Sequence, residues 1–233
     1  IVENRTSELR QANEELEEFT YIATHDLKSP LASIKGHLEI IRNEVGRSNI
    51  MADRSIHWIE DSIENAENKI QNIIDIAKIK NTKAEEYSKI DLFTLVNKVK
   101  EGLTTEQKSQ VESFSINANE YIQVVSNKYY LETIINNLVS NAIKYRKHGE
   151  KVEINVDLSK KITGIQLIIR DNGLGIDMAK DKLKLFKMFH RIHDHVEGSG
   201  IGLYLSSKMV ENLGGKMEVE SELGRGTTFV ITL

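Results

Sequence analysis

One residue type and several patterns are missing from this 233-residue sequence, and each absence excludes a class of protein or site. There is no cysteine, which excludes disulfide bonds and metal sites built from thiolates. No apolar run approaches the length of a membrane span and no signal peptide is visible, so we expect a soluble, cytoplasmic chain without membrane contact. The formal net charge of −4 lacks the basic excess of proteins that bind polyanions, which argues against nucleic acid as a partner.

Proline is nearly absent too, and the single one, Pro30, interrupts a long helical pattern. Apolar residues up to Val45 recur at alternating spacings of three and four, as a coiled-coil seam requires, except for three successive steps of four that end at Leu31. Pro30 removes one backbone donor and frees the carbonyl of Asp26, which predicts a bend next to the solvent-facing His25. An exposed imidazole beside a carboxylate, at a weak point of a regular helix, indicates a group that a partner reaches.

A second apolar pattern with the same spacings runs from Ile56 to Ala77, after a turn at residues 46–49. Two helices with matching seams and a short connection predict an antiparallel hairpin over residues 1–80. One hairpin leaves both seams partly uncovered, so we expect a homodimer that forms a four-helix bundle; packing of the hairpin on the C-terminal part of its own chain is the alternative. The sequence begins within the heptad pattern, so we expect a fragment whose sensor domain, and any membrane anchor, lie upstream on the full-length chain.

Helices and strands are predicted to alternate in the second part of the chain. The polar, aperiodic residues 81–88 predict a linker, and residues 89–233 predict a separate domain. We expect helices over residues 91–103, 128–147 and 202–213, with Asp91 as the N-cap of the first. We expect strands over residues 113–116, 121–125, 152–158, 164–170, 216–221 and 227–233. This grouping predicts an α+β fold, a two-layer sandwich with a mixed sheet.

Two motifs carry polar groups that suit a nucleotide. Asn137, Asn141 and Lys144 share one face of the predicted helix, where an amide oxygen suits Mg²⁺ and a lysine suits phosphate. Paired asparagines on a helix are also commonly only solvated. Asp171-Asn172-Gly173-Leu174-Gly175-Ile176 follows an apolar strand, so its aspartate can accept from an exocyclic amine while glycine backbone lies under a ring. The alternative is an ordinary turn.

Two further motifs frame a predicted lid. Leu185-Phe186-Lys187-Met188-Phe189-His190-Arg191 places two aromatic residues three apart before a polar run, which favours a mobile lid. Gly198-Ser199-Gly200-Ile201-Gly202-Leu203 opens a helix, where backbone amides can bind phosphate, although the spacing is neither a dinucleotide fingerprint nor a Walker loop. The spacing of His190, His193 and His195 fits no regular element, so a solvated loop is favoured over a metal site.

Together these motifs resemble those of one family. His25-Asp26-Leu27-Lys28-Ser29-Pro30 closely resembles the H-box of sensor histidine kinases, and the four later motifs resemble, in order, the nucleotide-binding boxes of that family's Bergerat-fold ATPase domain. The resemblance implies that His25 is autophosphorylated, with Asp26 orienting and deprotonating its imidazole. It implies that ATP is bound with Asn141 holding Mg²⁺ and Asp171 binding the adenine amine. The other implied ATP-binding residues are Asn137, Lys144, Tyr145, Gly173, Gly175, Ile176, Phe189, Arg191, Gly198, Ser199, Gly200, Ile201, Gly202, Leu203 and Thr227.

The same resemblance implies a partner and leaves three alternatives. It implies that the phosphoryl group passes from His25 to an aspartate of a response-regulator receiver domain, which docks around Ser29, Ser33 and the second helix. Ser29 stands where the family often has Thr or Asn to orient water for dephosphorylation of the partner, so phosphatase activity stays an open expectation. The alternatives are another Bergerat-fold ATPase, such as a topoisomerase or mismatch-repair relative, a protein-serine kinase of the anti-sigma type, and a non-catalytic dimeric signalling scaffold. The first two lack an acceptor-histidine hairpin.

Overall fold

The computed structural model describes residues 31–41, 54–63, 66–67, 70, 87–162, 164–188, 190–192 and 200–233. The chain divides into two compact units, residues 1–77 and 78–233. The predicted phosphoacceptor residues His25, Asp26 and Ser29, and the bend predicted at Pro30, lie outside the described residues. The turn predicted at residues 46–49 lies outside them as well.

The described parts of the first unit are helical and pack on each other. The hydroxyl oxygens of Ser33 and Ser62 lie 3.0 Å apart, and the ring centroids of His37 and Trp58 lie 5.3 Å apart. These contacts between segments 31–41 and 54–63 agree with the predicted helical hairpin. Large apolar side chains remain exposed on both segments, namely Leu31, Leu38, Ile40, Ile56, Trp58 and Ile63, and Ile70 further along is exposed too.

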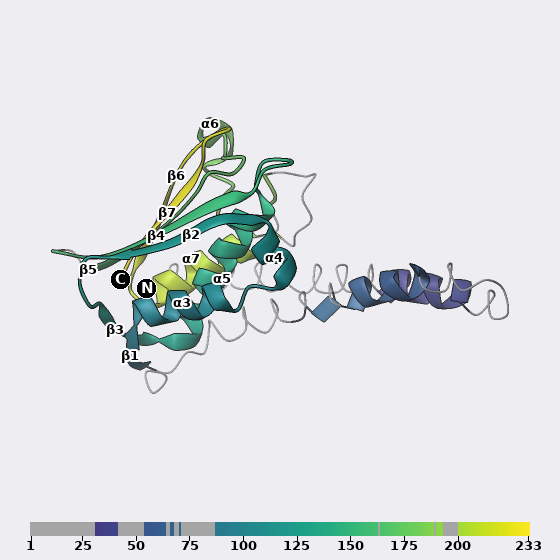
Figure 1. Cartoon of the computed structure of the whole chain (residues 1–233), viewed down its shortest axis with the longest axis horizontal. Helices are drawn as coiled ribbons and strands as arrows, with labels where there is room; N and C mark the ends of the chain where they lie inside the picture. The colour runs from purple at the N-terminus through teal and green to yellow at the C-terminus, as the bar shows by residue number, and fades with distance from the viewer. Residues whose placement is uncertain are drawn as a thin grey trace, which may run out of the picture. The chain divides into compact units, whose positions relative to one another are not determined.

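The second unit is a sandwich of helices on a sheet. Its elements are, in order, β1 (Tyr87–Asp91), α3 (Leu92–Glu101), α4 (Thr105–Ser109), β2 (Val111–Ala118), β3 (Gln123–Asn127), α5 (Lys128–Lys144), β4 (Val152–Lys161), β5 (Gly164–Asp171), α6 (Met178–Asp181), α7 (Gly202–Asn212), β6 (Lys216–Glu222) and β7 (Gly226–Thr232). Five strands form a sheet in the order β2-β4-β5-β7-β6, in which only the β2–β4 pair is parallel. Strands β1 and β3 form a separate antiparallel pair. Figure 1 shows α3, α5 and α7 on one face of the five-stranded sheet, which confirms the predicted two-layer α+β fold with a mixed sheet.

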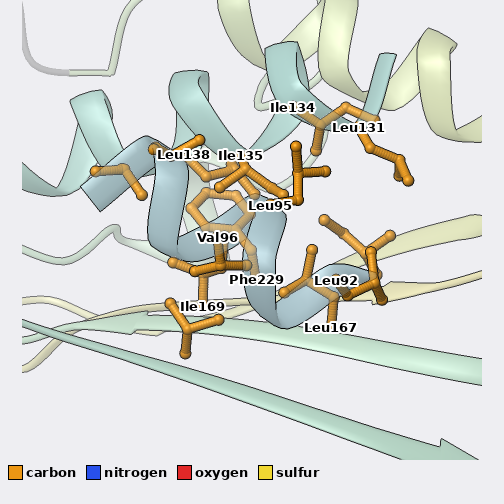
Figure 2. Close-up of a cluster of buried hydrophobic side chains, with 14 of the residues drawn as sticks. Leu92, Leu95, Val96, Leu131, Ile134, Ile135, Leu138, Leu167, Ile169 and Phe229 are labelled. Carbon is orange, nitrogen blue, oxygen red and sulfur yellow. The ribbon is translucent and has the colours of Figure 1, made fainter. Parts of the chain in front are cut away.

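The core lies between the helices and one face of the sheet. Apolar side chains recur every three or four residues along α3 and α5 and at alternate residues along the strands, so each element turns one apolar face inward. Figure 2 shows the central part of this cluster, in which Phe229 of β7 lies among side chains of both helices. The labelled residues are Leu92, Leu95, Val96, Leu131, Ile134, Ile135, Leu138, Leu167, Ile169 and Phe229. Packing of this kind holds the ends of α5 and β5, where the site motifs lie, in fixed positions.

Several elements differ from the sequence predictions, among them the short helix α6, which was not predicted. Strand β1 begins at Tyr87, inside the segment predicted to be the linker, because it pairs with β3 along all five of its residues. Helix α4 was not predicted, although Thr104 and Gln107 form a capping box that the sequence pattern could have revealed. Helix α5 ends at Lys144, three residues before the predicted end. The predicted N-cap of α3 is confirmed, since the Asp91 carboxylate accepts from the amides of Phe93 and Thr94.

Candidate nucleotide-binding site

Asp171 is the last residue of strand β5, and only one of its two carboxylate oxygens accepts hydrogen bonds from described residues. Its Oδ1 accepts hydrogen bonds from the backbone amides of Gly173, at 2.8 Å, and Thr227, at 3.2 Å. Burial raises the pKa of the carboxyl group above its usual value, and the two amide donors offset part of that rise. Its Oδ2 makes no hydrogen bond to another described residue. One oxygen is therefore fixed by the backbone, and the other is left to accept from a ligand.

The glycine-containing loop after Asp171 lies against the end of α5 and the turn between β6 and β7. The amide of Leu174 donates to the carbonyl of Tyr145 at 2.8 Å. A Cβ atom on Gly173 would lie 2.5 Å from that same carbonyl oxygen. Gly175 has a φ of +66°, and a Cβ atom there would lie 2.0 Å from the carbonyl oxygen of Glu222. Both glycines are therefore needed for the close approach of three backbone segments.

Ser221 of β6 holds the far end of this loop, and the sequence analysis missed it. The amide of Ile176 donates to Ser221 Oγ at 2.9 Å, while that hydroxyl lies 2.8 Å from the carbonyl oxygen of Gly226. Its oxygen also lies 3.0 Å from Thr227 Oγ1. No pattern in the sequence distinguishes Ser221, because it is one more polar residue in an alternating strand. Its role depends on a contact between residues 45 positions apart.

Comparing two glycine-to-alanine variants tests this packing. Gly149 and Gly175 both have positive φ, but only Gly175 has another atom within 4 Å of a built Cβ. We expect Gly149→Ala to cost about 1 kcal/mol of unfolding free energy through backbone strain alone. We expect Gly175→Ala to cost about 3 kcal/mol or more, because Glu222 must move. Urea unfolding of both variants measures the difference; equal losses would contradict the close approach at Gly175.

Helix α5 presents Asn137 toward the start of α7. The side-chain nitrogen of Asn137 lies 3.4 Å from the carbonyl oxygen of Gly202 and 3.3 Å from Ser206 Oγ. Asn141 follows one turn later on α5, is half-buried, and its side chain makes no hydrogen bond to another described residue. Lys144 is the last residue of the helix. The structure thus brings Asn137 to the second glycine motif, which lies 65 residues away in the sequence.

The second glycine motif is described from Gly200 onward. Gly200 has a φ of +67°, Ile201 is buried, and Gly202 is the first residue of α7. No side chain caps this helix, unlike α3, α4 and α5, which are capped by their own polar residues. The first amides of α7 therefore have no intrahelical acceptor and suit an anion. Of the other predicted residues, Phe189, Gly198 and Ser199 lie outside the described part of the chain.

Arg191 lies close enough to Tyr145 for its charge to act on the phenol. Burial raises the pKa of Tyr145, and the positive charge of Arg191 opposes that rise. Tyr145 is also the C-cap of α5. Its backbone carbonyl accepts from Leu174 of the first glycine motif, and its phenol lies within the electrostatic influence of the lid residue Arg191. The structure therefore brings together predicted residues from the helix, the first glycine motif and the start of the lid.

The described residues contain neither a helix that could span a membrane nor a cluster of metal-ligating side chains. No described helix combines the length and the apolarity needed to cross a bilayer. Within the same residues, no three histidine, cysteine, aspartate or glutamate side chains gather as metal ligands would. Of the lid histidines, His193 and His195 lie outside the described ranges, so their predicted solvated state stays a prediction.

The fold and the site together define an ATPase-like nucleotide-binding domain that follows a helical hairpin. A family model described as "Histidine kinase-, DNA gyrase B-, and HSP90-like ATPase" matches residues 127–233. A second model, "His Kinase A (phospho-acceptor) domain", matches residues 15–82. The chain belongs to the sensor histidine kinase family of two-component systems.

Individual relatives are similar along almost the whole chain. The chain is 28% identical over 237 residues to the methanogenesis regulatory histidine kinase FilI of Methanothrix harundinacea. It is 24% identical over 234 residues to the sensor histidine kinase WalK of Bacillus subtilis. These matches cover 100% and 97% of this chain but only 26% and 38% of the two relatives.

Solved structures share the fold. The histidine kinase AdeS of Acinetobacter baumannii matches with a TM-score of 0.69 and 18% identity, over 89% of this chain and 96% of that one. The histidine kinase ThkA, in its complex with the response regulator protein TrrA, matches with a TM-score of 0.72 and 18% identity. That match covers 97% of this chain and 65% of ThkA. At such identities the likeness shows the fold alone.

Proposed function

We propose that this chain is the kinase core of a sensor histidine kinase, which uses ATP to phosphorylate His25 and relays the phosphoryl group to an aspartate of a response-regulator receiver domain. The observation that carries the proposal is the Asp171 carboxylate. It has one oxygen fixed by two backbone amides and the other without a described partner, at the end of a strand and beside a glycine loop. The two family models, an acceptor domain ahead of an ATPase domain, support the same conclusion.

In this proposal Asp171 recognises the adenine ring. Its Oδ2 accepts a hydrogen bond from the exocyclic amine, because an ionised carboxylate is a strong acceptor and has no proton to donate. Gly173 and Gly175 allow the close backbone approach that holds this loop beside Asp171, where we place the ring. The related kinase ShkA has been crystallised with AMPPNP, an ATP analogue, which supports ATP as the nucleotide.

The phosphates are proposed to lie between α5 and the start of α7. The Asn141 amide fits an Mg²⁺ ligand, since it is half-buried, makes no hydrogen bond to another described residue, and presents a neutral oxygen of the kind Mg²⁺ accepts. When bound, Mg²⁺ would neutralise phosphate charge during transfer. Lys144, Arg191 and the uncapped amides of α7 supply further positive charge. Tyr145 lines the same end of α5.

The proposed transfer is an in-line displacement at the γ-phosphorus. The unprotonated imidazole nitrogen of His25 forms a bond to phosphorus as the bond from phosphorus to the β,γ-bridging oxygen breaks and ADP leaves. Asp26 hydrogen-bonds to the other imidazole nitrogen, keeps the attacking nitrogen unprotonated, and takes up the proton that the ring loses. An aspartate of the receiver domain then accepts the phosphoryl group while Asp26 returns the proton to the ring, which regenerates neutral His25.

We propose two partners, a second copy of this chain and a receiver domain, from the exposed side chains of the first unit and from the relatives. We propose residues 1–80 as the dimerisation and acceptor hairpin. The catalytic domain predicted over residues 89–233 begins slightly earlier, with β1 at Tyr87, so the linker predicted over 81–88 ends before Tyr87. The exposed apolar side chains of the hairpin support a homodimer that buries them in a four-helix bundle. The complex of ThkA with a response regulator supports the receiver domain as the second partner. An upstream sensor domain and a cytoplasmic location complete the proposal.

Incubation with γ-labelled ATP and Mg²⁺ tests the whole reaction. We expect the chain to acquire an acid-labile, base-stable label, as a phosphohistidine requires, and to lose it to an added receiver domain. Free phosphate without labelled protein would instead identify another Bergerat-fold ATPase. A dimer that neither hydrolyses ATP nor takes label would identify a signalling scaffold.

A further inference from the structure

Ser206 is a hydroxyl residue in a place where the helix otherwise buries apolar side chains. It lies on the inner face of α7 with Leu205, Met209 and Val210, and it is 0% exposed. A hydroxyl removed from water is costly unless a polar partner replaces the water. The hydrogen-bond partner of Ser206 is a side chain from another helix, the amide of Asn137, which lies 69 residues away in the sequence.

The Asn137 amide reaches the first turn of α7 at two points. Its Nδ2 lies 3.3 Å from Ser206 Oγ and 3.4 Å from the carbonyl oxygen of Gly202. An amide nitrogen carries two hydrogens, so both contacts can be made at once. Gly202 and Ser206 are one helical turn apart, and a single side chain therefore spans that turn. With both hydrogens donated to α7, the orientation of the amide is also fixed.

This contact matters because the residue before α7, Ile201, supplies no side-chain cap to the first amides of the helix. The chain approaches α7 through Gly200, whose φ is +67°. Asn141, meanwhile, lies one turn from Asn137 on the same helix. A tie between Asn137 and α7 therefore fixes the distance between the second glycine motif and Asn141.

We propose that Ser206 is a positioning residue of the nucleotide site, which together with Asn137 clamps the first turn of α7 to α5. The clamp holds the uncapped amides of α7 at a constant distance from Asn141, so the phosphate and metal positions stay aligned before a nucleotide arrives. Nucleotide as the ligand rests on the proposed function, but the clamp does not. The clamp mainly raises the affinity for nucleotide, because a site that is already ordered loses less conformational entropy when the nucleotide binds.

The matched substitutions are Ser206→Ala and Ser207→Ala. The neighbouring Ser207 is half-buried, and its hydroxyl faces Glu211 of the same helix rather than α5. Hydrogen exchange of the whole 233-residue chain without nucleotide, followed by mass spectrometry of peptides that cover α7, reports the clamp directly. We expect exchange of the bonded amides in this turn, such as that of Leu205, which donates to the carbonyl of Ile201, to be about tenfold faster in Ser206→Ala. It should be unchanged in Ser207→Ala, because only Ser206→Ala loses a hydrogen bond between helices. Ser206→Cys, which keeps a weak acceptor on a larger atom, should lie between them.

A double-mutant cycle and a nucleotide titration complete the test. Because Asn137 and Ser206 act as one contact, adding Ser206→Ala to Asn137→Ala should change exchange no further. In the titration, Ser206→Ala should raise Kd for ATP about tenfold and leave kcat at saturating ATP within about twofold. Additive effects in the cycle, or equal exchange in Ser206→Ala and Ser207→Ala, would overturn the clamp. A chain that shows the clamp by exchange but binds no ATP would overturn the proposed function and leave the clamp standing.

Discussion

Asp171→Asn is expected to weaken ATP binding by about 100-fold, because it turns an acceptor toward the adenine amine into a donor. The asparagine oxygen can still accept from the amides of Gly173 and Thr227, as Oδ1 of the aspartate does. Its NH₂ group then occupies the position of Oδ2, where it opposes the NH₂ of adenine. Isothermal titration with ATP and with GTP measures the change. Since GTP carries no amine at that ring position, its weak binding should be much less affected.

The stability of the same variant separates a binding defect from a folding defect. Burial raises the pKa of Asp171 in the folded chain, so the folded state holds its proton more tightly than the unfolded state. The associated stability is present below the unfolded pKa and is lost as pH rises through the raised folded pKa. Asp171→Asn removes this loss, so at neutral pH we expect the nucleotide-free variant to be as stable as the unmodified chain or more stable. ATP affinity of the unmodified chain should fall as acid protonates Asp171.

The matched control for this substitution is Asp157→Asn on strand β4. Asp157 accepts from Asn117 and pairs with Arg170 on the open face of the sheet. Partly exposed pairs of this kind contribute about 1 kcal/mol or less, so the control should lose little stability and keep its ATP affinity. Equal losses of affinity in Asp157→Asn and Asp171→Asn would contradict adenine recognition by Asp171.

His25→Gln is expected to lower incorporation of label from γ-labelled ATP by about 1000-fold or more, because glutamine offers no nucleophilic nitrogen. Binding of ATP should be unchanged, since the nucleotide site lies in the other domain. His57→Gln is the control, because it makes the same substitution at an exposed histidine of the same hairpin whose nearest carboxylate, on Asp61, lies 3.8 Å away. Label retained in His25→Gln would reject His25 as the acceptor.

Mixing the two variants then reveals the direction of transfer. His25→Gln keeps a working nucleotide site, and Asp171→Asn keeps the acceptor. At an ATP concentration too low to fill the weakened site of Asp171→Asn, label on that chain after exchange of subunits comes from the nucleotide site of the other chain. Label in the mixture would therefore show transfer across the dimer, and a mixture without label would show transfer within one chain.

Local patterns were enough to predict much of the second unit. The three long helices were predicted within three residues at each end, because their apolar periodicity is strong and Asp91 and the residues near Gly202 mark where two of them begin. Helix α5 ends three residues before its predicted end because of a contact with a distant part of the chain. The carbonyl of Tyr145 accepts from Leu174, which lies in the loop after β5, so the chain leaves the helical path there.

The contacts that complete the site were not predictable from periodicity. The second amide on Asp171 comes from Thr227, which is 56 residues away, and Ser206 becomes a partner of Asn137 only through the packing of two helices. Strand β1 has a polar sequence, and its extended form depends on pairing with β3. Such features arise from tertiary structure, and no local propensity marks them. The roles of His25, Asp26 and Ser29 remain predictions from the sequence motif.

The position of β7 inside the sheet has a consequence for how the protein is made. Strand β7 lies between β5 and β6, although it follows every other strand in the sequence, and it supplies both the Thr227 amide to Asp171 and the central Phe229. During synthesis, a ribosome that has not yet released residues 226–232 holds a chain in which β5 has one open edge and Asp171 lacks a donor. The nascent chain therefore cannot form the nucleotide pocket. Its hairpin, translated first, can dimerise before any catalytic domain is ready to act on it.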